Sequence, residues 1–453
     1  MMCILFCRSQ PSKPAPDCKA GKKRHRERRQ TLDLTRLTMI ITTCAACAAP
    51  LAHDAPRCVR CNTRYCNSTC QHDHWRRGHK QICKKIHRGG NAEQYHAGEK
   101  YKEAVKVAVA GEACDDDVRL LQCHDTKGQT CYICTEGVKR RTGEGVVRGF
   151  CRCSGETSVA HVSCLVRQAE ILVGEGVENK LGGATMDSRW KLWSECSLCE
   201  KKYRGFVSCA LGWACWRTYC NRPERDVARQ MSMKNVGPGL NSAGRYELAL
   251  SANYAALAAF ERISPDGELI LTIREDIAFS LDRLGRTEEA SIVRRAVYQA
   301  RVGSLDGTRD TLSAAARLSS NLIETHSHGI ALEFLPEKIS TAKRVLGCNH
   351  ETTLRLEKHY AMALFLVDTI IDPSKTWEEE KVEAFHLMEK VYRLMREHLG
   401  ASHVLTRSCV GLIKDNRLLL EGRGLDVAVV TRGKSSTKLA LDLGDQASSD
   451  DAT

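Results

Sequence analysis

The C-terminal half of the chain carries a helical pattern of apolar and polar positions that recurs from one segment to the next. From about residue 232, apolar residues return at helical spacing, as one face of a helix requires. NSAGRYELAL (241–250) aligns with DRLGRTEEAS (282–291), and four similar inter-repeat turns mark the series: SPDGELIL, SLDGTRDTL, LGCNHETTL and LGASHVLT. Each segment offers two helices that cannot bury their apolar faces alone. The pattern therefore predicts all-α helical repeats over residues 232–420, stacked as a solenoid, with an insertion at TIIDPSKTWEE.

The N-terminal half is broken into shorter segments. Residues 92–113 are rich in Ala, Glu and Lys and place apolar residues at helical spacing, which predicts a helix within a linker spanning 84–130. Residues 206–231 are interpreted as a connector that leads into the repeats. Residues 1–43 and 421–453 are interpreted as disordered tails, the second of them acidic at its end.

The formal net charge is +13, and part of it lies in the run KKRHRERR (22–29). This run is compatible with a nuclear localisation signal, a nucleic-acid patch or a solvated tail. A start of translation at Met39 would remove it from the protein. No base-reading helix or basic sheet with interleaved aromatic residues accompanies the run, so we do not expect nucleic-acid binding.

Cysteine is the unusual feature of the composition, with 24 residues in a chain of 453. The first residues lack a charged region and a clear cleavage site, so they do not form a typical secretory signal. No stretch approaches 18 consecutive apolar residues, and we therefore expect no membrane span. A reducing compartment, cytoplasmic or nuclear, follows as the expectation, and clustered cysteines there more often bind metal than form disulfides.

A first cluster of possible metal ligands lies between residues 44 and 83. Its eight residues form four closely spaced pairs: Cys44 and Cys47, Cys58 and Cys61, Cys66 and Cys70, His79 and Cys83. Two residues separated by a tight turn can direct their side chains at one ion, and eight ligands suffice for two tetrahedral zinc ions. Two zinc ions would replace the core that so short a segment cannot build.

This segment resembles a MYND zinc finger. Besides the ligand pairs, the resemblance includes Tyr65, Gln71, Trp75 and the His79–Lys80 pair. The resemblance implies cross-braced sites, with Cys44, Cys47, Cys66 and Cys70 on one zinc and Cys58, Cys61, His79 and Cys83 on the other. His72 and His74 fit no ligand position and are expected on the surface. The family generally docks short peptides, often proline-rich ones.

A second cluster extends from residue 131 to residue 199. Its ligand candidates are again eight: Cys131, Cys134, Cys151, Cys153, His161, Cys164, Cys196 and Cys199. The C-x-C pair, followed after seven residues by H-x2-C, resembles a RING-CH (RINGv) domain over residues 131–205. That resemblance implies one zinc on Cys131, Cys134, His161 and Cys164, and another on Cys151, Cys153, Cys196 and Cys199. The sequence thus predicts four zinc ions per chain.

RING-type domains are mostly ubiquitin ligases, which hold a ubiquitin-conjugating enzyme and orient its thioester without a covalent intermediate. The resemblance implies that apolar residues near the zinc turns dock this enzyme, and Ile133, Leu198 and Trp193 are the candidates. Three features depart from the family, one of them the long polar, Gly-rich loop between Cys164 and Cys196. Gln168 stands where a tryptophan is usual, and Glu200 stands where many ligases carry a basic residue.

The repeats resemble tetratricopeptide repeats of the kinesin-light-chain type, on the Gly-Arg pairs at 244–245 and 285–286. Such repeats bind peptides, which implies a peptide or protein substrate on the repeats and on the first finger. We therefore predict a zinc-dependent RING-CH-type ubiquitin ligase, with a non-enzymatic adaptor as the alternative. The sequence shows no nucleophile–base arrangement and no phosphate loop. Eight protein ligands for each pair of zinc ions leave no open coordination position for catalysis.

Several cysteines remain outside the two clusters. Cys209, Cys215 and Cys220 lie among two tryptophans without the paired spacing of a third metal site, and we interpret them as buried apolar residues. Cys348 and Cys409 lie in helical pattern and are likewise expected to be structural.

Overall fold

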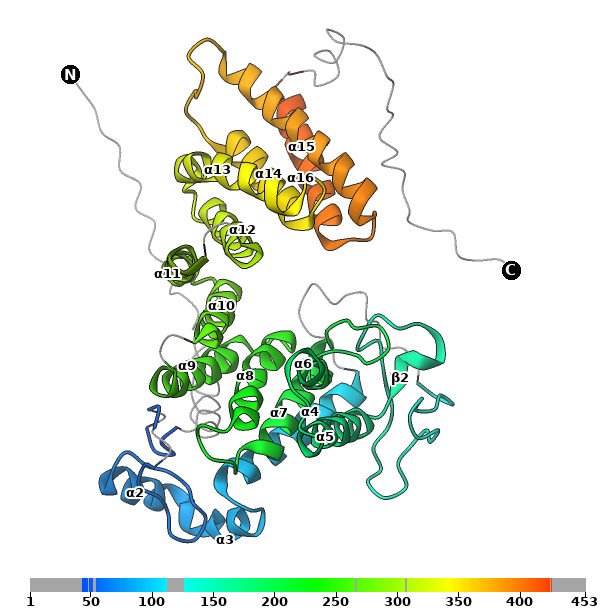
Figure 1. The fold of residues 1–453 in the computed structure, drawn as a ribbon, viewed down its shortest axis with the longest axis vertical. Coiled ribbons are helices and arrows are strands. Elements are labelled where there is room, and N and C mark those ends of the chain that lie inside the picture. The colour runs from blue at the N-terminus through cyan, green and yellow to red at the C-terminus, as the bar shows by residue number, and fades with distance from the viewer. Residues whose placement is uncertain are drawn as a thin grey trace, which may run out of the picture. The chain divides into compact units, whose positions relative to one another are not determined.

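The computed structural model divides into two compact units, residues 1–286 and residues 287–453, which are described separately (Figure 1). The described residues are 43–47, 49–51, 54–111, 126–264, 267–305, 308–423 and 425. The basic run, Met39, the acidic segment before the second cluster and the end of the C-terminal tail lie outside these residues.

The first cluster of unit 1 folds as two turns followed by a short helical region. An isolated bridge pairs Thr43 with Pro50, and a second pairs Arg57 with Arg64. The helical region consists of α2 (Ser68–His74), η1 (Trp75–His79) and α3 (Lys80–Arg88). α2 begins where the Asn67 side chain accepts a hydrogen bond from Cys70 N. The chain kinks at Gly78, whose φ of 119° places it in a region that favours glycine.

The second cluster of unit 1 combines a small sheet with two helices. β1 (Val147–Arg148) pairs antiparallel with β2 (Val159–Ala160), with Val147 opposite Ala160. A short 3₁₀ turn, η3 (Gly155–Ser158), leads into β2. α5 (Val162–Glu178) and α6 (Gly183–Lys191) follow and pack against each other, and α5 also packs against α7.

Three helices form the centre of unit 1: α4 (Ala92–Ala110), α7 (Gly205–Tyr219) and α8 (Val227–Ser242). α7 packs against both α4 and α8 (Figure 1). A Cβ atom on Gly212 would lie 2.8 Å from Asn235 O, and one on Gly239 would lie 2.8 Å from Ser208 O. These two glycines therefore allow α7 and α8 to cross with their backbones in close approach.

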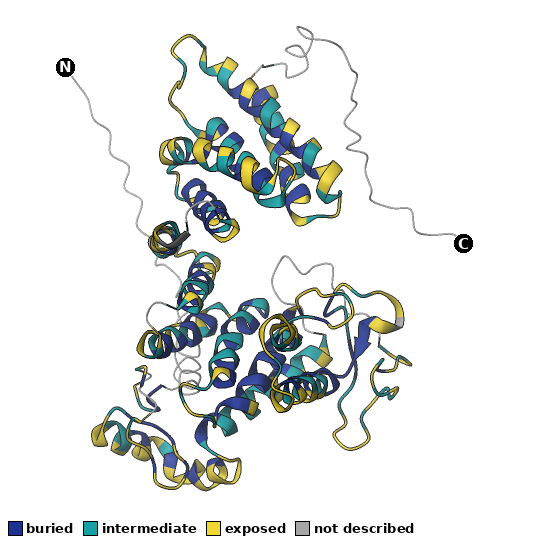
Figure 2. Cartoon of the chain, viewed as in Figure 1, coloured by how far each residue is buried: buried dark blue, intermediate teal, exposed yellow. Residues whose placement is uncertain are grey.

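The prediction of a linker at 84–130 and a connector at 206–231 is wrong. Both segments contain a core helix, since α4 and α7 pack against each other. Eleven of the fifteen residues of α7 are buried (Figure 2). The predicted helix at 92–113 exists but ends at Ala110, where Gly111 adopts a left-handed conformation with φ of 71°.

The repeats continue from α8 as consecutive helices that each pack on the next within a unit. Unit 1 contains α9 (Tyr246–Ile263) and α10 (Glu268–Arg283). Unit 2 contains α11 (Thr287–Leu305), α12 (Arg309–Glu324), α13 (His328–Leu346), α14 (Glu351–Leu366), α15 (Trp377–Leu399) and α16 (Val404–Gly422). α8 contacts α10, and α12 contacts α14, so alternate helices also meet. The predicted fold class, zinc-ligand modules joined to all-α repeats, is confirmed.

One turn recurs within the repeats even where its sequence changes. Gly244 and Gly285 have φ of 69° and 75°, and His326 takes the same left-handed conformation with φ of 54°. In all three turns the next residue donates its N–H to a carbonyl five residues earlier, at Leu240, Leu281 and Leu322. The third repeat therefore keeps the turn although it has lost the glycine.

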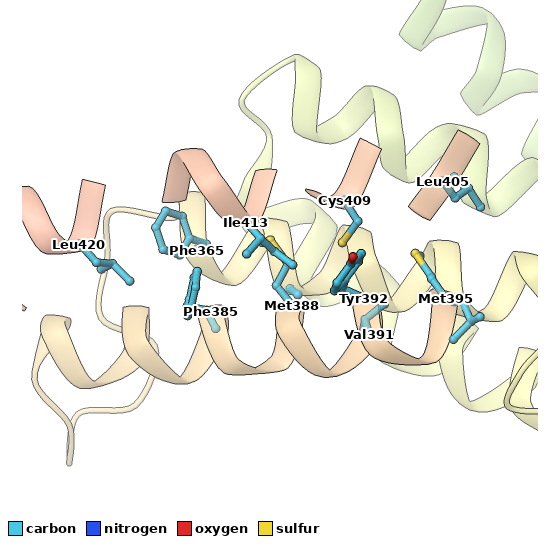
Figure 3. Packing of buried hydrophobic residues seen from close by; sticks show 13 residues of the cluster. Phe365, Phe385, Met388, Val391, Tyr392, Met395, Leu405, Cys409, Ile413 and Leu420 are labelled. Carbon is cyan, nitrogen blue, oxygen red and sulfur yellow. The ribbon is translucent and has the colours of Figure 1, made fainter. Parts of the chain in front are cut away.

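Unit 2 has one hydrophobic core where α12, α13 and α14 meet and another where α14, α15 and α16 meet. Met388 and Tyr392 of α15 point toward Ile413 and Cys409 of α16 (Figure 3). The insertion before α15 is fixed at its base by Lys381, a buried lysine whose Nζ donates to Leu364 O and Val367 O. Among the described residues, no helix combines the length and apolar character that a membrane crossing needs.

Candidate metal centres

The first and second clusters, residues 44–83 and 131–199, are called the first and second finger below. The four C-x2-C turns of these two fingers share one backbone hydrogen bond. The N–H of each first cysteine donates to the carbonyl five residues later: Cys44 to Ala49, Cys58 to Thr63, Cys131 to Glu136 and Cys196 to Lys201, at 2.8–3.0 Å. This bond closes a tight loop that directs both thiols to the same side. The C-x2-C spacing therefore allows both cysteines of a pair to bind the same metal ion.

In the turns that begin at Cys58, Cys131 and Cys196, the residue after the second cysteine adopts a left-handed conformation. Asn62, Thr135 and Glu200 have φ of 56°, 60° and 53°. Each donates its N–H to the carbonyl of the first cysteine, at 2.8–2.9 Å. Non-glycine residues adopt such values rarely, so the turn and its ligands hold these residues there.

The structure brings the ligand candidates of the first finger together in two groups: Cys44, Cys47, Cys66 and Cys70, and Cys58, Cys61, His79 and Cys83. All ligand atoms within a group lie within 4.8 Å of one another. The Sγ atoms of Cys47 and Cys66 are 3.5 Å apart, and those of Cys58 and Cys83 are 3.7 Å apart. Tetrahedral zinc–thiolate bonds of about 2.3 Å place sulfur atoms about 3.8 Å apart, so both groups fit a zinc ion.

His79 presents its Nε2 atom to the second of these groups, 3.4 Å from the Sγ of Cys61. Burial lowers the pKa of His79, which keeps the imidazole neutral and able to bind a metal. Thr63 Oγ1 lies 3.0 Å from the same sulfur and can hydrogen-bond to the thiolate. Thr63 is not among the predicted site residues, because a threonine between ligands has no characteristic spacing.

His74 is not a surface residue, and that expectation is wrong. Its side chain is buried, and its Nδ1 atom lies 3.0 Å from the Tyr65 hydroxyl. Its ring centroid is 4.7 Å from that of His79, so His74 supports the ligand without binding the metal. His72, two positions earlier on α2, is exposed as expected.

The second finger brings its candidates together in the two groups implied by cross-bracing: Cys131, Cys134, His161 and Cys164, and Cys151, Cys153, Cys196 and Cys199. His161 presents Nδ1, at 3.4 Å from the Sγ of Cys134 and 3.9 Å from that of Cys164. The Sγ atoms of Cys153 and Cys196 are 3.7 Å apart, again a zinc–thiolate spacing. The predicted cofactor, zinc in four sites, is therefore confirmed.

Backbone amides support the negative charge of the thiolates in this finger. The N–H groups of Ile133 and His161 both donate to the Sγ of Cys131, each at 3.4 Å. Although burial raises the pKa of Cys131, these donors lower it overall. In the first finger, similar amide donors outweigh burial and lower the pKa of Cys44 to about 7. The lowered pKa of each thiol favours the thiolate form that binds zinc.

Residues 44–83 match the family model of the MYND finger. The match spans the first two metal groups and ends at the ligand Cys83. None of the curated proteins matches the chain.

Solved structures give weak matches. Two crystal structures of a putative kinesin light chain with nearly identical TPR-like repeats, from Podosopora anserina, are 14% identical to this chain. They cover 52% of this chain and 97% of their own, with TM-scores of 0.36 and 0.35. BtubC (BKLC) from P. vanneervenii is 13% identical, with coverage of 62% and 97% and a TM-score of 0.29.

The MYND finger is fixed to the helices of unit 1 by a buried group of three charges. Glu93 of α4 lies 3.6 Å from Arg64 of the finger and 3.3 Å from Arg229 of α8. All three side chains are at least nine-tenths buried, and Arg229 also lies over the Trp216 ring at 4.8 Å. Nearby, Ala92 N donates to Cys61 O at 3.0 Å. The sequence offers no local signal for these contacts, because their partners are far apart in the chain.

The three residues expected to dock a partner on the second finger are placed differently from one another. Ile133 and Leu198 are 38% and 53% exposed, within the C-x2-C turns of two different metal groups. Trp193 is only 1% exposed, so its assignment to a docking surface is wrong. It faces α7 and meets Tyr219 edge to face at 6.1 Å, because α6 ends against that helix. Gln168 is half-buried on α5, and Glu200 is exposed.

The remaining cysteines divide between core and surface. Cys209, Cys215 and Cys220 are buried in or at the end of α7, and among the described residues they join no metal-like group. Cys409 is buried in the core of unit 2, as expected. Cys348 is exposed in the loop between α13 and α14, so its interpretation as a structural helix residue is wrong.

Proposed function

We propose that the protein is a RING-CH-type ubiquitin ligase whose repeats and MYND finger recruit a protein substrate. Zinc modules and helical repeats support a role in protein interaction. The observation that supports ligase activity in particular is the exposure of Ile133 and Leu198. Each lies between two ligands of a different zinc group, which matches the pair of apolar positions that RING domains use to dock a conjugating enzyme.

The exposed side chains of these two residues do not contribute to the folding of the finger. A C-x2-C turn has little core of its own, so a polar residue at its tip would serve folding equally well. Two apolar tips on one zinc module instead offer anchors that lose contact with water when a partner binds. The neighbouring Ile133 N–H to Cys131 Sγ bond fixes the backbone of one anchor relative to the metal.

The chemistry expected at this surface is orientation of a thioester held by the partner. Each zinc group has four protein ligands, so no position is left for water or substrate. The zinc ions would therefore shape the docking surface, and the lysine that receives ubiquitin would come from the recruited protein.

A non-enzymatic adaptor is the second candidate, and Glu200 is the observation that favours it. Glu200 follows the last ligand directly, is exposed, and is held with φ of 53° by the zinc turn. A carboxylate there cannot donate the hydrogen bonds that a basic residue would offer to the thioester partner. In this alternative, the second finger binds protein without promoting transfer.

The deciding experiment measures discharge of ubiquitin from charged conjugating enzymes by the full-length, zinc-loaded protein, over a broad enzyme panel. Ile133→Ala and Leu198→Ala should each reduce discharge about fivefold or more, because truncation of an interface anchor commonly costs about 1 kcal/mol or more. Zinc content should remain at the wild-type value in both variants. Cys131→Ala should lose zinc and discharge together.

Val138→Ala is the matched control, because Val138 is 60% exposed on the same finger but outside the C-x2-C turns. It should leave discharge unchanged. If the wild-type protein discharges no enzyme of the panel, the ligase is ruled out and the adaptor stands.

A further inference from the structure

A pocket of about 430 Å³ opens in unit 2 between the alternate helices α12, α14 and α16. α12 packs directly on α14, whereas α14 and α16 each pack on α15 and leave space between them. Gly411 of α16 lines this space, and a Cβ atom built there would meet nothing within 4 Å. The volume lies within the range of about 300–1,000 Å³ typical of small-molecule sites.

One wall of the pocket carries a buried cation. Lys358 of α14 is only 7% exposed, and its Nζ donates to Ser408 Oγ at 3.3 Å. Among the described residues Lys358 joins no ion pair, although the nearby Glu324 acts on its charge electrostatically. The adjacent His359 is buried and bonded to Ser319, so it does not supply a negative charge. Buried ammonium groups are normally paired, and burial lowers the pKa of Lys358 accordingly.

Two carboxylates of the pocket have the opposite charge and lie toward solvent. Glu324 of α12 and Asp415 of α16 both line the pocket and are exposed. Glu324 accepts a hydrogen bond from Ser320 Oγ at 3.1 Å. These carboxylates would repel a simple anion, and Lys358 would repel a simple amine. A ligand that carries both charges complements both ends of the pocket.

Apolar side chains occupy the space between the two charged ends. Ile323, Met362 and Leu412 line the pocket from its three helices, and each is buried or half-buried. They offer an apolar contact to a ligand body of a few carbon atoms. Removal of such a body from water adds affinity in proportion to the apolar area that becomes buried.

We propose that this pocket binds a free apolar α-amino acid in its zwitterionic form. The carboxylate lies against Lys358 and Ser408, the ammonium group lies against Glu324 and Asp415, and the side chain lies along Met362 and Leu412. This site is independent of the zinc fingers. Its occupancy would hold α14 and α16 at a fixed separation, and so adjust the face that alternate repeat helices present.

Isothermal titration calorimetry of the full-length protein with leucine, methionine and phenylalanine tests the proposal. At least one of the three should bind with a dissociation constant in the millimolar range or below. N-acetyl-leucine lacks the ammonium charge and leucinamide lacks the carboxylate. When leucine is the ligand, each should bind at least about tenfold more weakly, which corresponds to about 1.4 kcal/mol. The corresponding derivatives serve for the other two amino acids.

Two variants locate the site. Lys358→Met removes the buried charge with little change of volume and should weaken amino-acid binding at least about tenfold, equivalent to about 1.4 kcal/mol. Gly411→Leu fills the pocket and should abolish binding while Lys358 is retained. Gly329→Leu is the control, because Gly329 is an exposed helical glycine of the same unit outside the pocket. If Lys358→Met loses its cooperative thermal transition, Gly411→Leu still decides.

The proposal is overturned if none of the three amino acids binds at millimolar concentration. It is equally overturned if the N-acetylated ligand binds as tightly as the free amino acid, since the pocket would then be a simple anion site. Binding that survives Gly411→Leu would place the ligand elsewhere and also contradict the proposal.

Discussion

Ser319 of α12 and His359 of α14 share a buried hydrogen bond of 2.8 Å, although they lie 40 residues apart in the chain. A comparable bond of 2.9 Å joins Ser280 of α10 to Asn241 of α8, at a separation of 39 residues. Both bonds connect alternate helices across one repeat length. Because a buried polar group needs a specific partner, each bond fixes the position of one repeat helix along the axis of the alternate helix that it contacts.

The first prediction concerns the pH dependence of unit 2 through His359. Burial holds the pKa of His359 well below its ordinary value of 6.5. His359 is therefore protonated only at a lower pH in the folded state than in the unfolded state. As pH falls below about 6.5, the unfolded state gains the proton first, and the free energy of unfolding decreases by up to about 1.4 kcal/mol per pH unit. This contribution is fully present above pH 6.5.

His359→Asn removes the titrating group and serves as the reference. The difference in unfolding free energy between wild type and this variant, measured by urea denaturation, should fall by about 1 kcal/mol between pH 7.5 and 5.5. A difference that does not change with pH would show that His359 titrates equally in both states.

The second prediction concerns zinc. Native mass spectrometry of reduced, full-length protein should find four zinc ions, and two or fewer would contradict the four ligand groups. Cys61→Ser and Cys196→Ser each remove one ligand from a different group and should each lose one zinc ion. Chelation should destabilise the helices of unit 1, since α4 and α7 contact the fingers, and leave the transition of unit 2 in place.

The third prediction concerns the charges that fix the MYND finger. Glu93→Gln leaves Arg64 and Arg229 buried without their carboxylate, and breaking a buried ion pair in this way costs about 3–5 kcal/mol. Thermal denaturation should show the loss in the transition of unit 1. Asp73→Asn breaks the Asp73–Arg77 pair, which is about half exposed, and should cost at most about 1 kcal/mol. Equal losses in the two variants would contradict the proposed importance of the buried group.

The fourth prediction concerns the crossing of α7 and α8. Gly239→Ala places a Cβ atom 2.8 Å from Ser208 O and 3.2 Å from Cys209 Cα, so the helices must separate, at a cost of about 1–3 kcal/mol. Gly411→Ala, in open space within α16, should instead stabilise its helix by about 0.5–1 kcal/mol. Chemical denaturation of both variants compares the two effects, and opposite signs are expected.

The ligand groups could be predicted from the sequence because each pair lies in one short turn and needs no knowledge of the rest of the fold. Exposure could not be predicted in the same way. Trp193 and His74 were assigned to the surface, yet the first meets Tyr219 of α7 and the second meets Tyr65. Both contacts depend on segments that the local pattern does not bring together.

The helical elements show a similar division. Amphipathic segments such as residues 92–113 were recognised by their periodicity, and the repeats were recognised by their Gly-Arg turns. α7 was missed because it is buried around most of its circumference, so it lacks the polar face that marks a surface helix. The turn at His326 was hard to recognise because the sequence there has lost the glycine while the backbone keeps the same conformation.

The position of α7 also determines which pieces of the protein could be studied alone. A truncated protein that began at residue 232, where the repeat pattern starts, would lack the helix that covers α8 and would expose Met233, Val236 and Leu240 to water. Such a fragment should aggregate on expression. Truncation after residue 286 instead keeps α7, α8 and both fingers in one polypeptide and follows the boundary between the two compact units.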